Sequence, residues 1–246
     1  MKSPIFLNLF IAAIICLAIA CNKDNNNKKQ MNCLLKSLSE TRTGGNTTWD
    51  FTYNNAGKLA SITTTSAAGV TVKDLTYTGN TIIGIAKLGG VFQMKDSVTL
   101  DTRGRILNMK RVFDLAGTVW ENIALEFNGD VLSKVHKSNS FAPTPVTRIA
   151  TYANGNLVSL ANSTSTTTYE YFPENAQVGD FMNLVPGMID WGLGLYPHQS
   201  LFKSSSSGGS TTTSAVYEKN ADGLIVKSTV MAGGNQLNYT FQYDCK

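Results

Sequence analysis

A short β-hairpin pattern recurs along this chain of 246 residues. In its clearest copy, residues 51–62, aromatic and β-branched residues alternate with polar ones up to Tyr53, a turn of Asn and Gly follows, and a second β-rich segment begins at Leu59. Tight hairpin turns need positive φ angles, which glycine adopts at little cost. The pattern therefore predicts two antiparallel strands joined by a short turn.

The same unit returns along most of the sequence. Its apolar anchor just before the turn lies at positions 53, 77, 100, 127 and 152, so that successive anchors are 23 to 27 residues apart. Two strands of about ten residues plus two turns fit a repeat of this length. We therefore predict an all-β fold, an antiparallel up-and-down meander of about a dozen strands that curls into a closed or nearly closed barrel.

The apolar residues after each turn depart from simple alternation. They are often three positions apart, as in Leu59 and Ile62, Leu132 and Val135, or Leu157 and Leu160. Strict alternation would place the two members of a pair on opposite faces of the sheet. Either a β-bulge lies between them or both faces are partly covered.

Residues 1–20 have the composition of a signal peptide. Lys2 precedes a nearly continuous apolar run, and this run is shorter than the ~20 residues of a spanning helix. The segment Leu17-Ala18-Ile19-Ala20-Cys21 resembles the lipobox of bacterial lipoproteins, although Ala18 stands where Leu is more common. The resemblance implies that Cys21 is acylated and begins the mature chain. The alternative is an ordinary cleavage site beside an incidental cysteine.

Residues 21–32 would then form a lipidated cysteine and a polar tether, which spans on the order of 20 Å. The chain has a net charge of +4, but without Lys2, Lys23, Lys28, Lys29 and Asp24 it retains 17 basic and 16 acidic residues. No basic patch indicates a nucleic-acid partner. Residues 33–246 are long enough for one core, and we expect them to form a single repetitive β domain.

Residues 174–197 interrupt the hairpin pattern. Apolar residues there follow helical spacing, Asp180 is a suitable N-cap, and Pro186 lies inside the stripe. We predict a short, kinked helical insertion near residues 180–196 that closes one end of the barrel. Its apolar stripe consists of Phe181, Leu184, Val185, Met188 and Ile189. The Ser, Thr and Gly-rich residues 204–214 predict a hairpin loop or a solvated strand edge.

These features together resemble a family of Bacteroidetes lipoproteins of unknown function. The resemblance rests on the lipobox-like start, the aromatic-x-x-(x)-Gly-x-Leu units, the apolar insertion and the ending Tyr239-Thr240-Phe241-Gln242-Tyr243. The units are also distantly similar to the YD repeats of secreted shell-forming proteins, although Leu100 and Phe127 replace the usual tyrosine. The resemblance covers most of residues 33–246 and implies a porin-like β-barrel. It implies no reaction and supplies no catalytic residues.

No pattern in the sequence favours catalysis. The two histidines, His136 and His198, do not have a metal-ligand spacing, and HExxH, GxSxG and Walker motifs are absent. Carboxylate pairs such as Glu121 and Glu126 are common on strand surfaces. We therefore expect no enzyme activity, no cofactor and no metal site.

Four aromatic residues are candidates for ligand binding. Trp49, Trp120, Trp191 and Tyr196 could stack on sugars or line an apolar pocket, and they could equally fill the core or the barrel ends.

The cysteine count indicates a disulfide between Cys33 and Cys245. Of the four cysteines, Cys16 leaves with the predicted signal peptide and Cys21 carries the predicted lipid. In a meander that closes on itself the first and last strands are neighbours, and disulfides form in the cell envelope. The alternative is two unpaired thiols.

Two functions remain open. The first is a lipid-anchored, monomeric outer-membrane protein that binds an apolar or glycan ligand, without enzyme activity. The second is a structural surface lipoprotein with a filled core and no ligand. The membrane is the expected partner in both, and the sequence does not choose between the periplasmic face and the cell surface.

Overall fold

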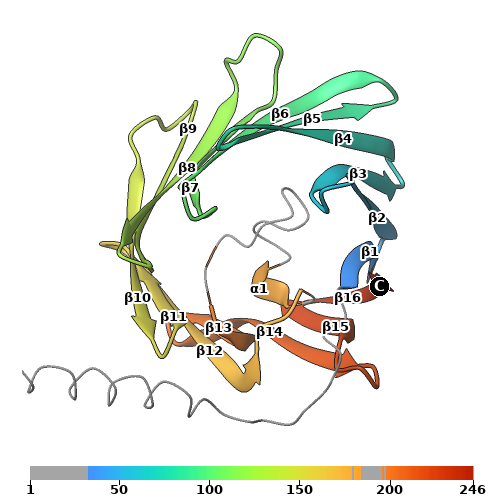
Figure 1. Ribbon diagram of the computed structural model, residues 1–246. Helices are drawn as coiled ribbons and strands as arrows, with labels where there is room; N and C mark the ends of the chain where they lie inside the picture. The colour runs from blue at the N-terminus through green and yellow to red at the C-terminus, as the bar shows by residue number, and fades with distance from the viewer. Residues whose placement is uncertain (1–32, 179, 184–195, 197, 246) are drawn as a thin grey trace, which may run out of the picture. The chain divides into compact units, whose positions relative to one another are not determined.

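The chain forms a closed antiparallel β-barrel, seen along its axis in Figure 1. The computed structural model describes residues 33–178, 180–183, 196 and 198–245. Each strand pairs with the strands before and after it, and β1 pairs with β16 to close the ring. The predicted all-β antiparallel barrel is therefore confirmed.

The described residues contain sixteen strands and one helical turn. They are β1 (Cys33–Arg42), β2 (Gly45–Tyr53), β3 (Leu59–Ser66), β4 (Gly69–Thr78), β5 (Thr81–Leu88), β6 (Val91–Leu100), β7 (Ile106–Val112), β8 (Trp120–Asn128), β9 (Val131–Asn139), β10 (Val146–Ala153), β11 (Asn156–Ala161), β12 (Thr166–Asn175), α1 (Phe181–Asn183), β13 (Ser200–Ser207), β14 (Ser210–Lys219), β15 (Ile225–Ala232) and β16 (Asn235–Cys245).

The prediction of about a dozen strands was too low. The polar run 204–214, expected as a loop or strand edge, instead forms the end of β13, a two-residue turn and the start of β14. Gly208 and Gly209 both have positive φ there, as a tight hairpin turn requires. The two strands were missed because serine and threonine side chains show no apolar alternation. Backbone pairing of β13 with β12 and of β14 with β15 holds both strands in the ring.

β-Bulges explain most of the three-residue apolar spacings. Between β2 and β3, Tyr53 pairs with Leu59 and Thr52 with Ser61, which leaves Ala60 as an extra residue. The bulge returns Leu59 and Ile62 to the same face, and both are buried. The shifts after Leu132 and Leu157 act in the same way. The pair Ile82 and Ile85 has no bulge, and Ile85 is accordingly exposed.

Both ends of the described chain lie at the same end of the barrel. Because sixteen strands alternate in direction, β1 begins and β16 finishes at the same end, where a disulfide joins Cys33 to Cys245. The turns at 54–58, 79–80 and 101–105, the end of β12 and the start of β13 also lie there. We call this the disulfide end, and the other the opposite end.

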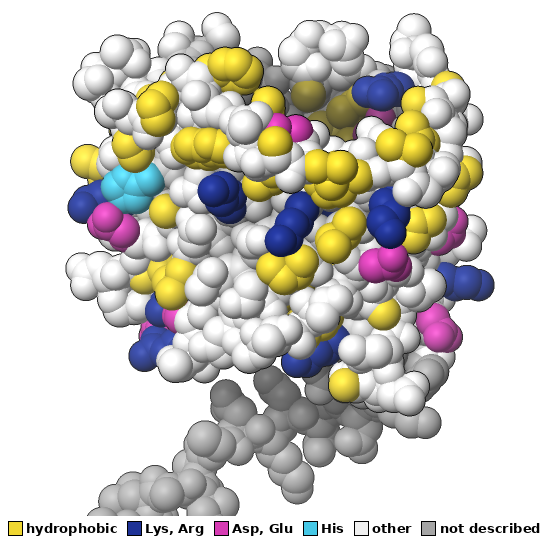
Figure 2. Space-filling view, turned by 90° about the horizontal axis from the view of Figure 1, so that it is seen from above, with side chains coloured by type: hydrophobic (Ala, Val, Ile, Leu, Met, Phe, Trp, Pro, Cys, Tyr) yellow, Lys and Arg dark blue, Asp and Glu magenta, His cyan; other side chains and the backbone are white. Residues whose placement is uncertain are grey.

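The two faces of the barrel wall differ in chemistry. Side chains from strands all around the ring form one buried apolar cluster, which is possible only on the inner face. The outer face carries ion pairs, including Lys134 with Glu126 and Lys227 with Glu218. Figure 2 shows charged and apolar side chains interspersed on it.

The predicted helical insertion is described only at its beginning. Asp180 is the N-cap of α1, because its Oδ1 accepts a hydrogen bond from the Met182 N–H at 3.0 Å. Phe181 packs against Phe202 of β13 with ring centroids 5.5 Å apart. The remaining stripe residues Leu184, Val185, Met188 and Ile189 lie outside the described residues. None of the described helices is long and apolar enough to cross a membrane.

Candidate functional site

An apolar pocket on the inner wall lies at the disulfide end, between β1 and β6. It has a volume of about 450 Å³, and side chains from three hairpin anchors and their neighbours line it. The main lining residues are Leu35, Phe51, Tyr53, Leu59, Tyr77, Ile82 and Leu100. We call this cavity the tyrosine pocket. Its volume is in the range of small-molecule sites.

The two tyrosine rings of this pocket are fixed by hydrogen bonds to the preceding strand. The Tyr53 hydroxyl donates to the Leu35 carbonyl at 2.9 Å, and the Tyr77 hydroxyl donates to the Leu59 carbonyl at 2.9 Å. Burial raises the pKa of Tyr53, with a smaller contribution from Tyr77, and burial also raises the pKa of Tyr77. Both hydroxyls therefore stay protonated and keep their hydrogen bonds to the backbone. The two rings are held in place and contribute apolar surface to the cavity.

One cation lines the tyrosine pocket. The ammonium of Lys58 lies 5.1 Å from the centroid of the Tyr77 ring, within cation–π distance. Lys58 forms no ion pair with the described part of the chain, and no carboxylate is among the described residues that line the pocket. The arrangement can accept an apolar body and, at its edge, a negatively charged group.

A row of charged side chains crosses the inner wall farther from the disulfide end. At its centre Asp96 of β6 is fully buried and accepts hydrogen bonds from Lys73 Nζ at 2.6 Å and from Arg111 Nε at 2.7 Å. The Lys73 side chain crosses β5 over Gly84 to reach Asp96. A side chain at position 84 would contact Lys73 there. These bonds hold β4, β6 and β7 together across the intervening strand.

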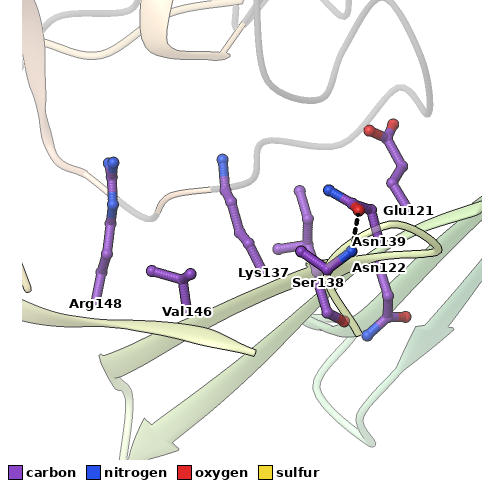
Figure 3. Close-up of a pocket in the computed structure, with 9 residues that line it drawn as sticks. Glu121, Asn122, Lys137, Ser138, Asn139, Val146 and Arg148 are labelled. Carbon is purple, nitrogen blue, oxygen red and sulfur yellow. Dashed lines mark hydrogen bonds between the residues drawn. The ribbon is translucent and has the colours of Figure 1, made fainter. Parts of the chain in front are cut away.

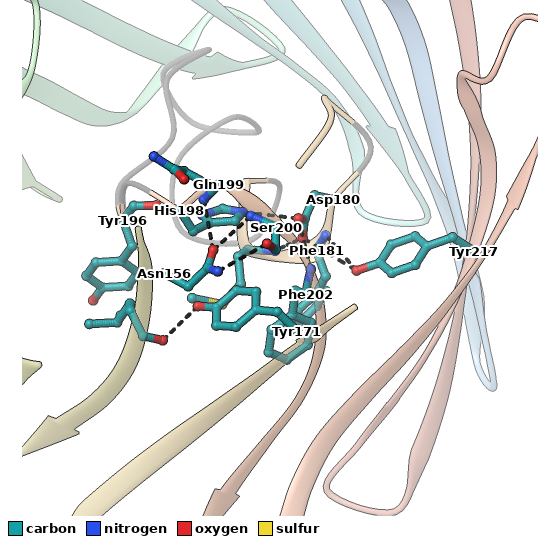
Figure 4. A network of polar contacts seen from close by, with 12 residues as sticks. Asn156, Tyr171, Asp180, Phe181, Tyr196, His198, Gln199, Ser200, Phe202 and Tyr217 are labelled. Atoms are coloured by element: carbon teal, nitrogen blue, oxygen red, sulfur yellow. Dashed lines mark hydrogen bonds and ion pairs between the residues drawn. The ribbon is translucent and has the colours of Figure 1, made fainter. Parts of the chain in front are cut away.

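A buried polar network holds α1 against the wall, as Figure 4 shows. The Asp180 carboxylate lies 3.0 Å from His198 Nε2 and accepts a hydrogen bond from the Phe202 N–H at 3.1 Å. The Tyr217 hydroxyl also donates to Asp180, at 3.4 Å. Burial, followed by the Asp180 charge, raises the pKa of Tyr217, which therefore remains a donor. All partners are occupied within the protein, so we interpret this network as structural.

The predicted aromatic ligand-binding residues do not converge. The Trp49 side chain lies on the inner face of the barrel and lines a small cavity of about 90 Å³. The Trp120 side chain lies on the outer face, where Lys110 Nζ is 5.4 Å from the centroid of its ring. Tyr196 is buried, with 8% of its surface exposed, and its carbonyl accepts a hydrogen bond from His198. Trp191 lies outside the described residues, as does the predicted lipidation site Cys21.

The sequence contained a signal for the residues that were missed. Tyr53, Tyr77 and Leu100 are themselves the hairpin anchors, so their equivalent positions had to gather at one end of the barrel. The charged row was not predicted, yet Lys73 and Asp96 are in phase with the inward apolar residues two and four positions later. In a closed barrel that phase points inward. No cluster of three or more potential metal ligands occurs among the described residues.

Comparison with known proteins supports the fold. No protein-family model and no curated protein matches the sequence. A porin-like protein from Bacteroides uniformis ATCC 8492 is 15% identical, with a TM-score of 0.61 over 85% of this chain and 98% of that chain. A porin-like protein from Bacteroides vulgatus ATCC 8482 is 11% identical, with a TM-score of 0.58 and the same coverage. The porin-like barrel that the family resemblance implied is thus supported, whereas the lipoprotein family and the YD-like repeats remain predictions.

Proposed function

We propose that this protein is a lipid-anchored, non-enzymatic protein of the cell envelope that binds an apolar ligand in the tyrosine pocket. The observation that carries the proposal is the pocket itself. It is a preformed apolar cavity of about 450 Å³ whose ring walls are held by hydrogen bonds to the backbone. A rigid apolar cavity with few polar groups is a typical small-molecule site, because little ordering is needed on binding.

The chemistry of the lining supports binding without reaction. Apart from Cys33, which is bonded in the disulfide, its described residues include no thiol, histidine or carboxylate that could act as nucleophile or general base. Lys58 favours a ligand that carries a negative head group on an apolar chain, such as a fatty acid. The porin-like neighbours come from Bacteroides, which agrees with an envelope location.

The position of the pocket agrees with a membrane anchor. Cys33 lines the pocket, and in the sequence it directly follows the predicted tether. A tether that reaches on the order of 20 Å would keep this end of the barrel near the bilayer in which the Cys21 lipid is inserted. An apolar ligand could then pass between the bilayer and the pocket over a short path.

Fatty-acid binding to a protein that lacks its own lipid tests the proposal. The full chain with Cys21→Ser is titrated with a fluorescent fatty acid and with the matching fatty alcohol. We expect the acid to bind more tightly than the alcohol, and Lys58→Ala to remove this difference. Leu100→Trp fills the pocket and should weaken binding by at least about tenfold.

Leu107→Trp is the matched control, because Leu107 lies on the outer face of the neighbouring strand and is 37% exposed. Equal binding by the Leu100→Trp and Leu107→Trp proteins would contradict the assigned pocket. Binding of oligosaccharides in place of fatty acids would favour the glycan alternative. A protein that binds neither class would favour a structural lipoprotein.

A further inference from the structure

Two cations lie side by side on the inner wall near the opposite end of the barrel. Lys137 of β9 pairs with Val146 of β10, and Arg148 follows Val146 by two positions on the same face. The two side chains are therefore diagonal neighbours, an arrangement in which like charges repel. Figure 3 shows both extending from the strands in the same direction.

Neither cation is neutralised by the described residues. Asp96 satisfies Lys73 and Arg111 at hydrogen-bond distance, but no carboxylate comes within 4.0 Å of Lys137 or Arg148 in the described ranges. Burial, and then the charge of Arg148, lowers the pKa of Lys137, and Glu121 opposes this shift only in part. Glu121 itself is half exposed and faces Arg111 at 3.8 Å.

A cavity of about 330 Å³ opens beside these cations. Glu121, Asn122, Ser138 and Asn139 contribute polar groups to its lining, and Ile123, Ala142 and Val146 contribute apolar ones. The Glu121 carboxylate is the one acidic group among these described lining residues, and it pairs with Arg111. The cavity is separate from the tyrosine pocket, because the two share no lining residue. It thus combines two cations that form no ion pair with a described residue with room for a small molecule.

We propose that this cavity binds the carboxylate or phosphate group of a small organic anion, with Arg148 and Lys137 as its ligands. The planar guanidinium of Arg148 matches two oxygens of such a group, and the ammonium of Lys137 adds a point charge from the neighbouring strand. The bound anion offsets the repulsion between the two cations. Asn139 shares the inner face with Lys137, and its Oδ1 accepts hydrogen bonds from the Phe141 and Ala142 N–H groups, so its amide nitrogen can donate to a hydroxyl group on the rest of the ligand.

Calorimetric titration of the full chain with Cys21→Ser tests this site with two probes. Inorganic phosphate represents the phosphate group, and glucuronate represents a carboxylate on a polyhydroxylated body. We expect at least one probe to bind, and Lys137→Met or Arg148→Met to weaken its binding by at least about tenfold. The bound probe should also protect Lys137 from acetylation, read by peptide mass spectrometry.

Lys95→Met is the control for loss of one positive charge, since Lys95 lies on the outer face of β6 and has no ion pair with a described residue. Its affinity for the probe should equal that of the parent. The proposal is overturned if neither probe binds, or if both inner-wall variants bind as tightly as Lys95→Met while remaining folded. Binding of only one probe identifies the recognised group. The same variants are also titrated with the fluorescent fatty acid. Unchanged fatty-acid affinity would show that the substitutions leave the tyrosine pocket intact.

Discussion

Four tyrosines share one role at the disulfide end. The hydroxyls of Tyr53, Tyr77, Tyr171 and Tyr243 each donate to a backbone carbonyl on the preceding, adjacent strand, at 2.8 to 2.9 Å. The four carbonyls belong to Leu35, Leu59, Leu157 and Ile225, and each of these residues directly precedes a β-bulge. Because a bulge disrupts the ladder locally, the hydroxyl supplies a partner where strand pairing is irregular. At each of these four positions the tyrosine therefore stabilises the β-bulge on the strand beside it.

Removal of one such hydroxyl tests this role. Tyr77→Phe should lower the free energy of unfolding by about 1 kcal/mol, because the Leu59 carbonyl loses its donor and the ring remains. Tyr152→Phe is the control, since the Tyr152 hydroxyl is buried without a hydrogen-bond partner among the described residues. It should leave stability unchanged or raise it. Urea denaturation measures both, and equal losses in the two variants would contradict the assigned role.

His198 should make stability depend on pH. Its Nδ1 faces the Tyr196 carbonyl at 2.8 Å and its Nε2 faces Asp180 at 3.0 Å, so only the doubly protonated ring donates to both. Burial alone would lower the pKa of His198, but the hydrogen bond and charge of Asp180 outweigh it and raise this pKa above 6.5. The ion pair therefore stabilises the fold below pH 6.5, and this stabilisation is lost as pH rises through the raised pKa.

Thermal unfolding of the protein from mildly acidic to mildly alkaline pH checks this expectation. His198→Gln should flatten the fall in melting temperature across that range. His136→Gln replaces the outer-face histidine and should change the slope less than His198→Gln does, because solvent screens its contact with the half-exposed Glu126. An unchanged slope in His198→Gln would assign the pH dependence to other groups.

At the scale of the strand, Gly84 makes a long-range ion pair possible. Lys73 on β4 and Asp96 on β6 both flank β5, and a side chain on Gly84 would lie 3.4 Å from Lys73 Cδ. Its absence lets the lysine lie across β5 and reach the carboxylate. Asp96 is 0% exposed, so its charge depends entirely on its protein partners.

Asp96→Asn should therefore destabilise the barrel by about 3 kcal/mol, because two buried cations lose their common counter-charge. Asp74→Asn is the matched control. Asp74 lies on the outer face of β4, and its replacement should change stability by less than about 0.5 kcal/mol. Denaturation of both proteins at one pH makes the comparison, and equal stability of the two would mean that Asp96 contributes little.

The sequence predicted elements whose signal is local. The hairpin units, the antiparallel meander and the Asp180 cap followed from turn residues and apolar spacing, which act over a few positions. The strand number was missed at β13 and β14 because Ser-rich strands have no apolar face, and only pairing with neighbours makes them strands. The inner charges were missed for a similar reason. Lys73 and Asp96 are recognised as buried only when the ring is known to close.

At the scale of the whole molecule, the strand number determines what the disulfide does. An even number of alternating strands brings both chain ends to the same end, and closure makes β1 and β16 neighbours. Cys33 and Cys245 are consequently direct register partners with Cα atoms 4.0 Å apart. The bond closes a loop with a sequence separation of 212 residues and fastens the seam of the barrel.

The double variant Cys33→Ser/Cys245→Ser should lose up to about 5 kcal/mol of unfolding free energy, because a long loop is no longer closed in the unfolded chain. We expect the seam between β1 and β16 to exchange amide hydrogens faster than β8 and β9 on the far part of the ring. Mass measurement before and after reduction checks the bond in the parent. Titration of two free thiols in the oxidised native protein would refute it.

The outer face determines how the whole molecule meets a membrane. Ion pairs such as Lys134 with Glu126 lie on it, and burying such charges in lipid is costly. We therefore expect the lipid on Cys21, and not the barrel wall, to hold the protein at the membrane. In detergent phase partition, the parent should enter the detergent phase and Cys21→Ser the aqueous phase. Cys16→Ser, in the predicted signal peptide, should partition as the parent does. Retention of Cys21→Ser in membranes after alkaline washing would mean that the barrel wall itself contacts lipid, and an aqueous parent would mean that Cys21 carries no lipid.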